Sequence, residues 1–447
     1  MDYPHGIRTH ARAACASAAL LLVAAAPLFA IPSYARQTKL PCSACHTQFL
    51  ELNDFGRTFK LNGYVLRVIE EITVQDSSGH VELSLNALPI VSIMALSSVT
   101  RTGKAQPGTL NSNVLLPDQL SVFLAGAISP RIGAFVQVTL DPQSGTIGLD
   151  NTEFRYASVT SLAAKPLAFG FSLNNNPTMS DLWNSTPVWG FPFVSAAVAP
   201  APAAAALIDG TLGQQVAGLT AFGYWNNTLY GEFGAYRSAP IGHAQPLDST
   251  AEMVTNGVAP YWRAAYTRQW GANSLMLGTY GMVAHIFPGA GSPLSGVTDH
   301  YTDIAADFQY GRAMGENSVT LGGTWIHERR DLKASEPGVA AQTLDTYRAR
   351  ATYRVGQRLG FSAGAFAISG DADQALYAPG PVTGSRTGGP NSSGAIGEID
   401  FNPWQNVRLG LQYTAFSKFN GSGSDYDGSG RSASANNTLY LFAWLLY

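Results

Sequence analysis

The sequence is poor in charge and almost free of cysteine. Charged residues make up only 13% of its 447 residues, about half the usual share in a soluble globular domain. Beyond the N-terminus it also lacks any run of about twenty apolar residues, the length that a membrane helix needs. Transmembrane strands alternate polar and apolar residues and form no such runs, so the two absences together favour a transmembrane β-barrel. The net charge of −3 argues against a nucleic-acid-binding protein.

The N-terminus is typical of a secretory signal peptide. Two arginines precede an apolar stretch over residues 13–26, and small residues follow it at cleavage distance. We expect cleavage after Ala30 or Ala35 and assign residues 1–35 to the signal. Cys15 precedes the apolar core and is lost with the signal, which leaves only two cysteines in the exported chain.

These two cysteines form the most specific motif of the chain. Cys42 and Cys45 are separated by two residues and are followed at once by His46. The C-x-x-C-H pattern is the attachment site of a c-type haem. Each thiol adds to one vinyl group of the porphyrin, and the histidine then lies close enough to the iron to be its proximal ligand. Because c-type haem is attached after export in bacteria, the signal peptide and the motif agree. The sequence predicts one covalently bound haem c.

Two other interpretations of the cysteine pair stay open. In an oxidising compartment, Cys42 and Cys45 can form a small disulfide. They can also be half of a zinc site, but zinc needs four ligands. Only His46 and His80 are nearby in sequence, and no second cysteine pair exists. Haem attachment is therefore the prediction that the motif favours.

Residues 36–80 form the predicted cytochrome segment. Apolar residues recur at helical spacing from Phe49 through Phe55 to Phe59, and Gly63 follows where a helix C-cap is expected. The pattern predicts one short amphipathic helix that lays its apolar face on the porphyrin. Such a segment is too short to bury a haem alone, so we expect the barrel to cover it.

The pattern does not fix the sixth ligand of the iron. No histidine or methionine lies between His46 and His80. Met94 sits in the first predicted strand, in phase with Ser92, on the face expected to point into the lumen. His80 and Met94 are the two candidate distal ligands, and a five-coordinate iron is the third alternative. Otherwise His80 is a solvated loop residue and Met94 contributes to packing.

Residues 81–447 repeat one unit, a strand of about ten alternating residues followed by a turn signal. Near 347–355 the alternation places Arg348, Arg350 and Arg354 on one face. Arginines are costly against lipid but well solvated in a watery lumen, so we expect this face to point inward. We predict an all-β fold, a transmembrane antiparallel β-barrel of about 16 strands with a short α-helical haem segment before it. The predicted strands are 84–99, 118–128, 131–140, 150–161, 165–174, 213–224, 227–237, 258–269, 273–287, 299–312, 316–329, 343–355, 358–370, 393–402, 405–417 and 435–447.

Tight and long connections alternate strictly between these strands. Ser129-Pro130 is one of the tight ones, and 175–212 is one of the long ones. Outer-membrane barrels show this alternation because their periplasmic turns are short and their outer loops are long. The chain also ends on an aromatic residue, Tyr447, a terminus that the barrel assembly machinery reads. We predict a protein of the bacterial outer membrane with a periplasmic N-terminus, extracellular long loops, and contacts to lipid and to that machinery.

Two features of the loops are candidates for function. The first is the loop at 175–192, which is rich in Asn, Pro and Trp. Three interpretations are open: the loop folds into the barrel as a constriction, it covers the haem, or it is an ordinary packed loop. Four aspartates in predicted outer loops, Asp371, Asp373, Asp425 and Asp427, carry carboxylates that suit hard cations and can attract Fe(II). The simpler interpretation is that outer loops are polar by default.

Several segments resemble one known family. They read ARQT at 35–38, PCSACH at 41–46, FGRTFKLNGY at 55–64, NNNPT at 174–178 and WNSTPVWGFP at 183–192. These segments resemble the fused cytochrome–porins, whose best-known members are iron(II)-oxidising outer-membrane cytochromes. The resemblance implies a single-haem segment ahead of a barrel of this size. It also implies attachment through the two cysteines and ligation by the histidine of the second segment, and nothing reliable about a substrate site.

Three functions are compatible with this architecture. The first is an electron conduit, in which the haem takes electrons from an extracellular donor and passes them to a periplasmic carrier, either a cytochrome or a copper protein. The resemblance favours Fe(II) as the donor, with iron(II) oxidation as the enzymatic activity, and the same path can run outward to an extracellular acceptor. The second function is a porin channel whose haem is a plug or a sensor. The third is a haem enzyme such as a peroxidase. We favour the conduit.

Overall fold

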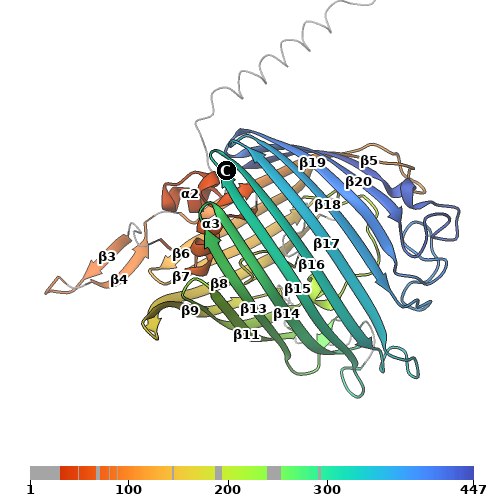
Figure 1. Ribbon diagram of the computed structural model, residues 1–447, viewed down its shortest axis with the longest axis horizontal. Helices are drawn as coiled ribbons and strands as arrows, with labels where there is room; N and C mark the ends of the chain where they lie inside the picture. The colour runs from red at the N-terminus through yellow and green to blue at the C-terminus, as the bar shows by residue number, and fades with distance from the viewer. Residues whose placement is uncertain are drawn as a thin grey trace, which may run out of the picture.

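The chain folds into one closed β-barrel with a small N-terminal segment at one end (Figure 1). The computed structural model describes residues 31–48, 50–66, 71–79, 81–87, 89–142, 145–186, 194–238, 253–289 and 293–447. Within these ranges, sixteen long antiparallel strands close the barrel, which confirms the predicted fold class. Residues 1–30 of the predicted signal peptide, together with Phe49 and His80, lie outside the described residues. Residues 31–35, which cleavage after Ala35 would remove and cleavage after Ala30 would keep, are described and include the start of the helix α2 (Pro32–Thr38).

The barrel strands follow one another around the wall in chain order. Their bounds are β5 (Val91–Thr102), β6 (Asn113–Ser129), β7 (Ile132–Asp141), β8 (Thr146–Leu162), β9 (Lys165–Asn174), β10 (Val216–Trp225), β11 (Leu229–Ser238), β13 (Ala259–Trp270), β14 (Asn273–Phe287), β15 (Asp299–Met314), β16 (Asn317–Asp331), β17 (Gln342–Val355), β18 (Leu359–Gly370), β19 (Ser392–Trp404), β20 (Val407–Lys418) and β21 (Thr438–Leu446). A two-residue strand, β12 (Val254–Thr255), adds to the wall beside β14. The barrel closes where β21 pairs with β5, with Leu446 opposite Met94.

Tight turns and long loops lie at opposite ends of this barrel. β6 and β7 are joined by a tight turn after Ser129, and β19 and β20 by another after Trp404. Because consecutive strands run up and down, all tight turns lie at one end, which we call the turn end. The C-terminus lies there too (Figure 1). The opposite end, with the long connections, is called the loop end.

Alternation along the strands separates the lumen from the exterior. On β17, the three predicted lumen arginines reach acids inside the barrel, and Tyr347 and Tyr353 of the same strand are exposed outside. Exposed Leu, Val, Ile and Phe side chains are numerous on the strands, for example Phe308 and Leu411. An apolar exterior of this extent is costly in water and fits a lipid bilayer.

The beginning of the barrel differs from the predicted strand at 84–99. The structure divides this stretch into β4 (Val81–Asn86) and β5, and β4 pairs with β3 (Glu71–Gln75) in a hairpin apart from the barrel wall. Pro89 lies at the break, where the missing backbone N–H cannot continue a ladder. Figure 1 shows this hairpin projecting beside the barrel.

The N-terminal segment fills the turn end of the barrel, and we call its described residues between 31 and 66 the plug. It contains α2 (Pro32–Thr38), the 3-10 turn η1 (Cys42–Ala44), the strands β1 (His46–Gln48) and β2 (Glu51–Leu52), and α3 (Asp54–Leu61). The plug reaches opposite walls. Gln37 accepts a hydrogen bond of 2.8 Å from the Ala127 backbone on β6, and Arg57 donates one of 3.1 Å to Gln309 on β15. No helix in the described part of the chain is long and apolar enough to cross a membrane.

The connection between β9 and β10 folds back into the lumen. Its residues 175–186, which we call the inner loop, are buried except for the half-buried Asn184. Farther along, the turn η2 (Leu207–Thr211) rests on the inner wall, where the backbone N–H of Ile208 donates to Asp303 over 2.7 Å. The part of the predicted loop at 175–192 that the structure describes therefore lies inside the barrel, as both the constriction and the haem-covering interpretation expect, and residues 187–192 lie outside the described residues.

Candidate functional site

The cysteine motif forms a single tight turn inside the plug. The backbone N–H of Cys45 donates to the carbonyl of Cys42 over 3.1 Å, which closes η1. Both cysteines carry thiols and are half-buried. Cys42, Cys45 and His46 line one and the same cavity. The structure therefore brings together the three residues that the sequence selects for haem attachment.

Helix α3 packs against this turn. Asn53 caps the helix by accepting a hydrogen bond of 2.9 Å from the Gly56 backbone, and its own backbone N–H donates to the Cys45 carbonyl over 2.9 Å. The Asn53 amide also donates to the carbonyl of Ala44 over 3.0 Å. Gly56 has to be glycine, because a Cβ there would lie 2.2 Å from the Cys45 carbonyl oxygen. The helix and the motif are thus packed backbone against backbone.

The helix is shorter than the sequence predicts. It begins only at Asp54, because β1 and β2 precede it as a two-stranded sheet and Asn53 then provides the cap. Phe59 is buried as expected, but Phe55 is 42% exposed and does not belong to the apolar face. Gly63 follows the helix at a positive φ of 70°, as predicted for a C-terminal glycine.

The cavity beside the motif is lined mainly by apolar and aromatic side chains. Tyr34 packs edge-on against Phe59, with ring centroids 5.2 Å apart, and stacks on Tyr64 at 5.3 Å. Phe135 of β7 and Trp183 of the inner loop complete the aromatic lining. The volume of this cavity is about 110 Å³. Two thiols, an imidazole and an aromatic lining are the groups that a covalently held porphyrin requires.

Burial keeps the reactive groups of the motif uncharged. It raises the pKa of Cys45 to about 11, with a smaller contribution from the neighbouring thiol of Cys42. Burial also lowers the pKa of His46 to about 4, partly offset by a hydrogen bond with the backbone of Glu51. The imidazole is therefore neutral at physiological pH, which is the form that ligates iron.

The plug is anchored to the barrel wall through several polar contacts near the motif. The backbone N–H of Cys42 donates over 3.4 Å to the side chain of Gln405 in the tight turn between β19 and β20. Gln48 accepts a hydrogen bond of 2.7 Å from Ser362 and donates one of 3.3 Å to Glu398. These partners place the motif at the turn end.

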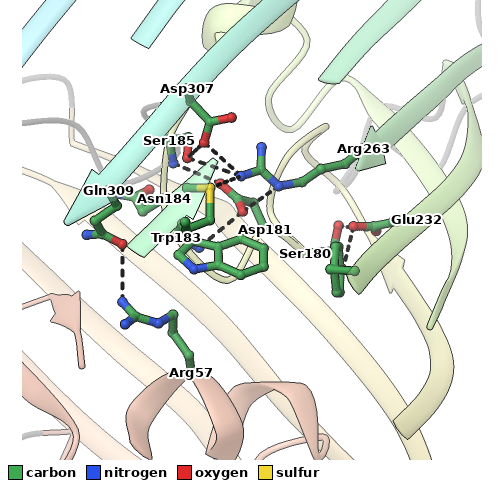
Figure 2. Close-up of polar contacts among 12 residues, drawn as sticks. Arg57, Ser180, Asp181, Trp183, Asn184, Ser185, Glu232, Arg263, Asp307 and Gln309 are labelled. Atoms are coloured by element: carbon green, nitrogen blue, oxygen red, sulfur yellow. Dashed lines mark hydrogen bonds and ion pairs between the residues drawn. The ribbon is translucent and has the colours of Figure 1, made fainter. Parts of the chain in front are cut away.

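The inner loop is fastened by a buried charge network, drawn in Figure 2. Arg263 of β13 pairs with Asp181 of the loop at 3.1 Å and with Asp307 of β15 at 2.8 Å. Ser185 of the loop donates to the same Asp307 carboxylate. The guanidinium also lies 5.1 Å over the ring of Trp183. Trp183 is thereby held against the cavity of the cysteine motif.

Lys60 joins the plug to the inner loop. Lys60 is 5% exposed, and its ammonium group donates to the carbonyls of Met179 at 2.6 Å and Asp181 at 2.9 Å. The hydroxyl of Tyr64 donates to Glu153 of β8 in the same buried region. Sequence reasoning missed these residues. Glu153 lies inside a predicted strand. The alternation of a strand shows which residues face the lumen, but not which of them contact the plug.

Of the candidate distal ligands, only Met94 lies in the described residues. It faces the lumen as predicted and is 4% exposed. It lines a neighbouring cavity, together with Leu50 and Phe135, rather than the cavity of the cysteine motif. Its role as a ligand stays a prediction.

The outer-loop aspartates accept hydrogen bonds from backbone groups of their own loops and of neighbouring segments. Asp427 accepts hydrogen bonds from the backbones of Val382 at 3.0 Å and Ser429 at 2.9 Å. Asp373 does the same for Ala375 at 2.8 Å. Within the described residues, no group of three His, Cys, Asp or Glu side chains is placed to hold a metal ion. These contacts favour the interpretation of the aspartates as loop-stabilising residues.

The chain is thus a closed sixteen-strand antiparallel barrel with an inward-folded loop. No family model matches the chain, and no curated protein matches it. Among solved structures, the outer membrane channel DcaP of Acinetobacter baumannii is 10% identical, with a TM-score of 0.49 over 84% of this chain and 99% of that chain. OmpT of Vibrio cholerae is 9% identical, with a TM-score of 0.44 over 80% and 97%. An anion-selective porin from Comamonas acidovorans is 12% identical, with a TM-score of 0.45 over 80% and 99%.

Proposed function

We propose that this protein is a single-haem c-type cytochrome built into an outer-membrane barrel, and that it carries electrons across that membrane. The extracellular donor is Fe(II), as the resemblance to the cytochrome–porins implies, and the acceptor is a periplasmic electron carrier. One observation supports the proposal above all others. Cys42, Cys45 and His46 line a single aromatic cavity inside the barrel, next to the turn end.

The residues of this cavity have distinct roles in the proposal. The thiols of Cys42 and Cys45 would hold a haem covalently, and the neutral imidazole of His46 would bind its iron. Phe59 and the other aromatic side chains of the cavity would exclude water from it; Tyr34 belongs to this set when the signal peptide is cleaved after Ala30. When bound, the haem supplies one-electron cycling of its iron, with a potential set by ligand, burial and nearby charge.

The turn end has the charge expected of a docking face for an acidic carrier. We infer that it faces the periplasm, because tight turns do so in outer-membrane barrels. Among described residues in or beside the tight turns, exposed basic side chains outnumber exposed acids: Arg131, Lys165, Arg268, Arg312 and Arg358 against Glu316. Complementary charge increases the rate of encounter with an acidic partner. The acceptor is therefore proposed to be a carrier with an acidic surface.

A porin channel with a haem plug is the second candidate. A separate lumen cavity of about 440 Å³ lies beyond the inner loop. Its lining is mostly apolar and includes the polar residues Thr324, Thr346 and Arg348. A lumen cavity of this volume leaves room for small solutes. Single-channel conductance of the purified protein in a planar bilayer distinguishes the two. A large, steady conductance supports the channel, and its absence supports the conduit.

Rapid mixing of the oxidised protein with Fe(II), followed at the haem absorbance bands, tests the conduit directly. We expect fast reduction in the wild type, and no haem bands in a Cys42→Ala, Cys45→Ala variant whose barrel still inserts. His46→Ala retains the covalent haem and loses electron transfer. If Fe(II) leaves the haem oxidised while dithionite reduces it, Fe(II) is not the donor. Full activity of His46→Ala contradicts the proposed mechanism.

A further inference from the structure

Residues 31–35 stay in the exported chain only when the signal peptide is cleaved after Ala30, and they are lost when it is cleaved after Ala35. Signal cleavage requires small residues at the first and third positions of the triplet before the cut. The triplet Ser33-Tyr34-Ala35 meets this requirement, whereas the triplet that ends at Ala30 begins with Leu28. The sequence therefore favours the removal of residues 31–35.

Tyr34 fills part of the space beside the cysteine motif. Its ring stacks on Tyr64 with ring centroids 5.3 Å apart, and the two ring planes lie 15° from parallel. Phe59 packs edge-on against the same ring at 5.2 Å, and the Tyr34 hydroxyl donates to the Ala134 carbonyl over 3.1 Å. Tyr34 lines the cavity that both cysteines and His46 line. A flat ring among aromatic side chains thus occupies space that a porphyrin at the cysteines needs.

Ile31 lies between this cavity and a second one. The cavity of the cysteine motif has a volume of about 110 Å³, and the neighbouring cavity, which Met94 lines, has a volume of about 300 Å³. Three described residues line both cavities: Ile31, Leu50 and Phe135. Pockets for drug-sized ligands begin at about 300 Å³, and a porphyrin is a ligand of at least that size. Without Ile31 and Tyr34 the first cavity is larger and loses one of the three side chains that separate it from the second.

The segment 31–35 is also less well satisfied than the chain that follows it. Ser33 is 2% exposed, and its backbone N–H donates to Ser92 over 2.9 Å. Its hydroxyl group has no hydrogen-bond partner among the described residues, which is unfavourable for a buried polar group. Gln37, which both cleavage sites retain, donates to the Tyr64 carbonyl over 3.0 Å and accepts from the Ala127 backbone over 2.8 Å. The chain beyond the second cleavage site thus keeps its own anchors on the plug and on the wall.

We propose that the signal peptide is cleaved between Ala35 and Arg36, and that this cut creates the haem cavity. A chain that keeps residues 31–35 fills the cavity with Tyr34 and separates it from the neighbouring one with Ile31. The reaction is a hydrolysis by the signal peptidase: water adds across the peptide bond, leaving a carboxyl group on Ala35 and an amino group on Arg36. The inference rests on the proposed function, because only a bound haem needs the space.

Intact mass and N-terminal sequencing of the protein purified from the outer membrane test the cleavage site. We expect Arg36 at the N-terminus and covalent haem in the denatured protein. Tyr34→Ala is the matched control: it keeps the small residues of the triplet, and its product has the same mass as the wild type because the changed residue is removed. A lower mass of this variant overturns the inference. So does a wild-type chain that begins at Ile31 and carries covalent haem, and that result leaves the proposed function intact. The absence of covalent haem refutes the proposed function.

Ala35→Leu tests whether the retained segment excludes the haem. Without a small residue before the second cut, cleavage follows Ala30 and the chain begins at Ile31, which intact mass verifies. We expect the fraction of chains with covalent haem to fall by about tenfold or more, because inserting a group into a filled site is unfavourable. Adding Ile31→Ala and Tyr34→Ala to this variant restores the fraction. Full haem content in a chain that begins at Ile31 overturns the inference. If Ala35→Leu does not insert, the N-terminus of the wild type decides alone.

Discussion

Gly56→Ala is the substitution that most directly tests how the cysteine motif is held. The new Cβ would lie 2.2 Å from the Cys45 carbonyl oxygen and 3.0 Å from the Leu52 side chain. Carbon and oxygen normally approach to about 3.3 Å, so the motif has to move away from α3 by about 1 Å. Because the closest atom belongs to the backbone, no side-chain rotation relieves the contact.

The free-energy change follows from two opposing effects. Overpacking of this kind destabilises by about 1–3 kcal/mol. Alanine has the better helix propensity and offsets this by up to about 1 kcal/mol. A net loss of about 1–2 kcal/mol raises the population of the displaced plug by about 5- to 30-fold. Under the proposed function, covalent haem attachment remains, because the substitution leaves the thiols of Cys42 and Cys45 in place.

Native-state hydrogen exchange of the haem protein is the assay. We expect the backbone amides of α3 and of the cysteine turn to exchange about 5- to 30-fold faster in Gly56→Ala, while the strand amides of the barrel keep their protection. Gly231→Ala in β11 is the matched control, since a Cβ there meets nothing within 4 Å. Unchanged exchange in Gly56→Ala refutes the reasoning, and so does equal acceleration in the control.

Other contacts lead to further predictions. Asp181→Asn leaves Arg263 with one fewer buried partner, which lowers the free energy of unfolding by about 3–5 kcal/mol. We therefore expect the inner loop to detach from the wall and the single-channel conductance to rise. An unchanged conductance contradicts this prediction. Lys60→Met removes two hydrogen bonds of a charged donor, about 1.5–3 kcal/mol each, and should make the plug more sensitive to limited proteolysis than Thr58→Ala does. Reversing the charge of Arg268 should slow electron transfer to an acidic carrier at low salt. It should have little effect at high salt, because salt screens charges on the surface. The same slowing at both ionic strengths argues against electrostatic docking.

The sequence predicts the barrel well because its signals are local. Period-two alternation identifies β7 and β17 almost to the residue, and the tight turns fix the order of the strands. The inward direction of Arg348 and Arg350 also follows from alternation, because arginine is excluded from lipid. The one strand that was wrong, 84–99, contains Pro89, and a proline in a predicted strand is a local signal against that assignment.

The plug is much less predictable, because its structure depends on contacts between distant segments. Helical spacing includes Phe55 and extends the helix back toward Phe49, but the cap at Asn53 and the hairpin before it are decided by the fit against the cysteine turn. The contact of Lys60 with the inner loop joins residues 119 and 121 positions apart. The periodicity of a single sequence reports only on neighbouring residues and cannot predict a contact between residues so far apart in the chain.

The position of the plug bears on which of the two candidate functions the barrel performs. A porin needs a continuous watery path, and a plug that bonds to β6 on one side and β15 on the other lies across that path. The inner loop adds a second layer, fixed to the plug by Lys60 and to the wall by Arg263. An electron conduit with one haem at the turn end needs no solute path through the plug, but its extracellular donor has to approach from the loop end of the lumen. The contacts that obstruct a solute at the turn end are the same ones that bury the cysteine motif, so the conductance measurement decides between the channel and the conduit.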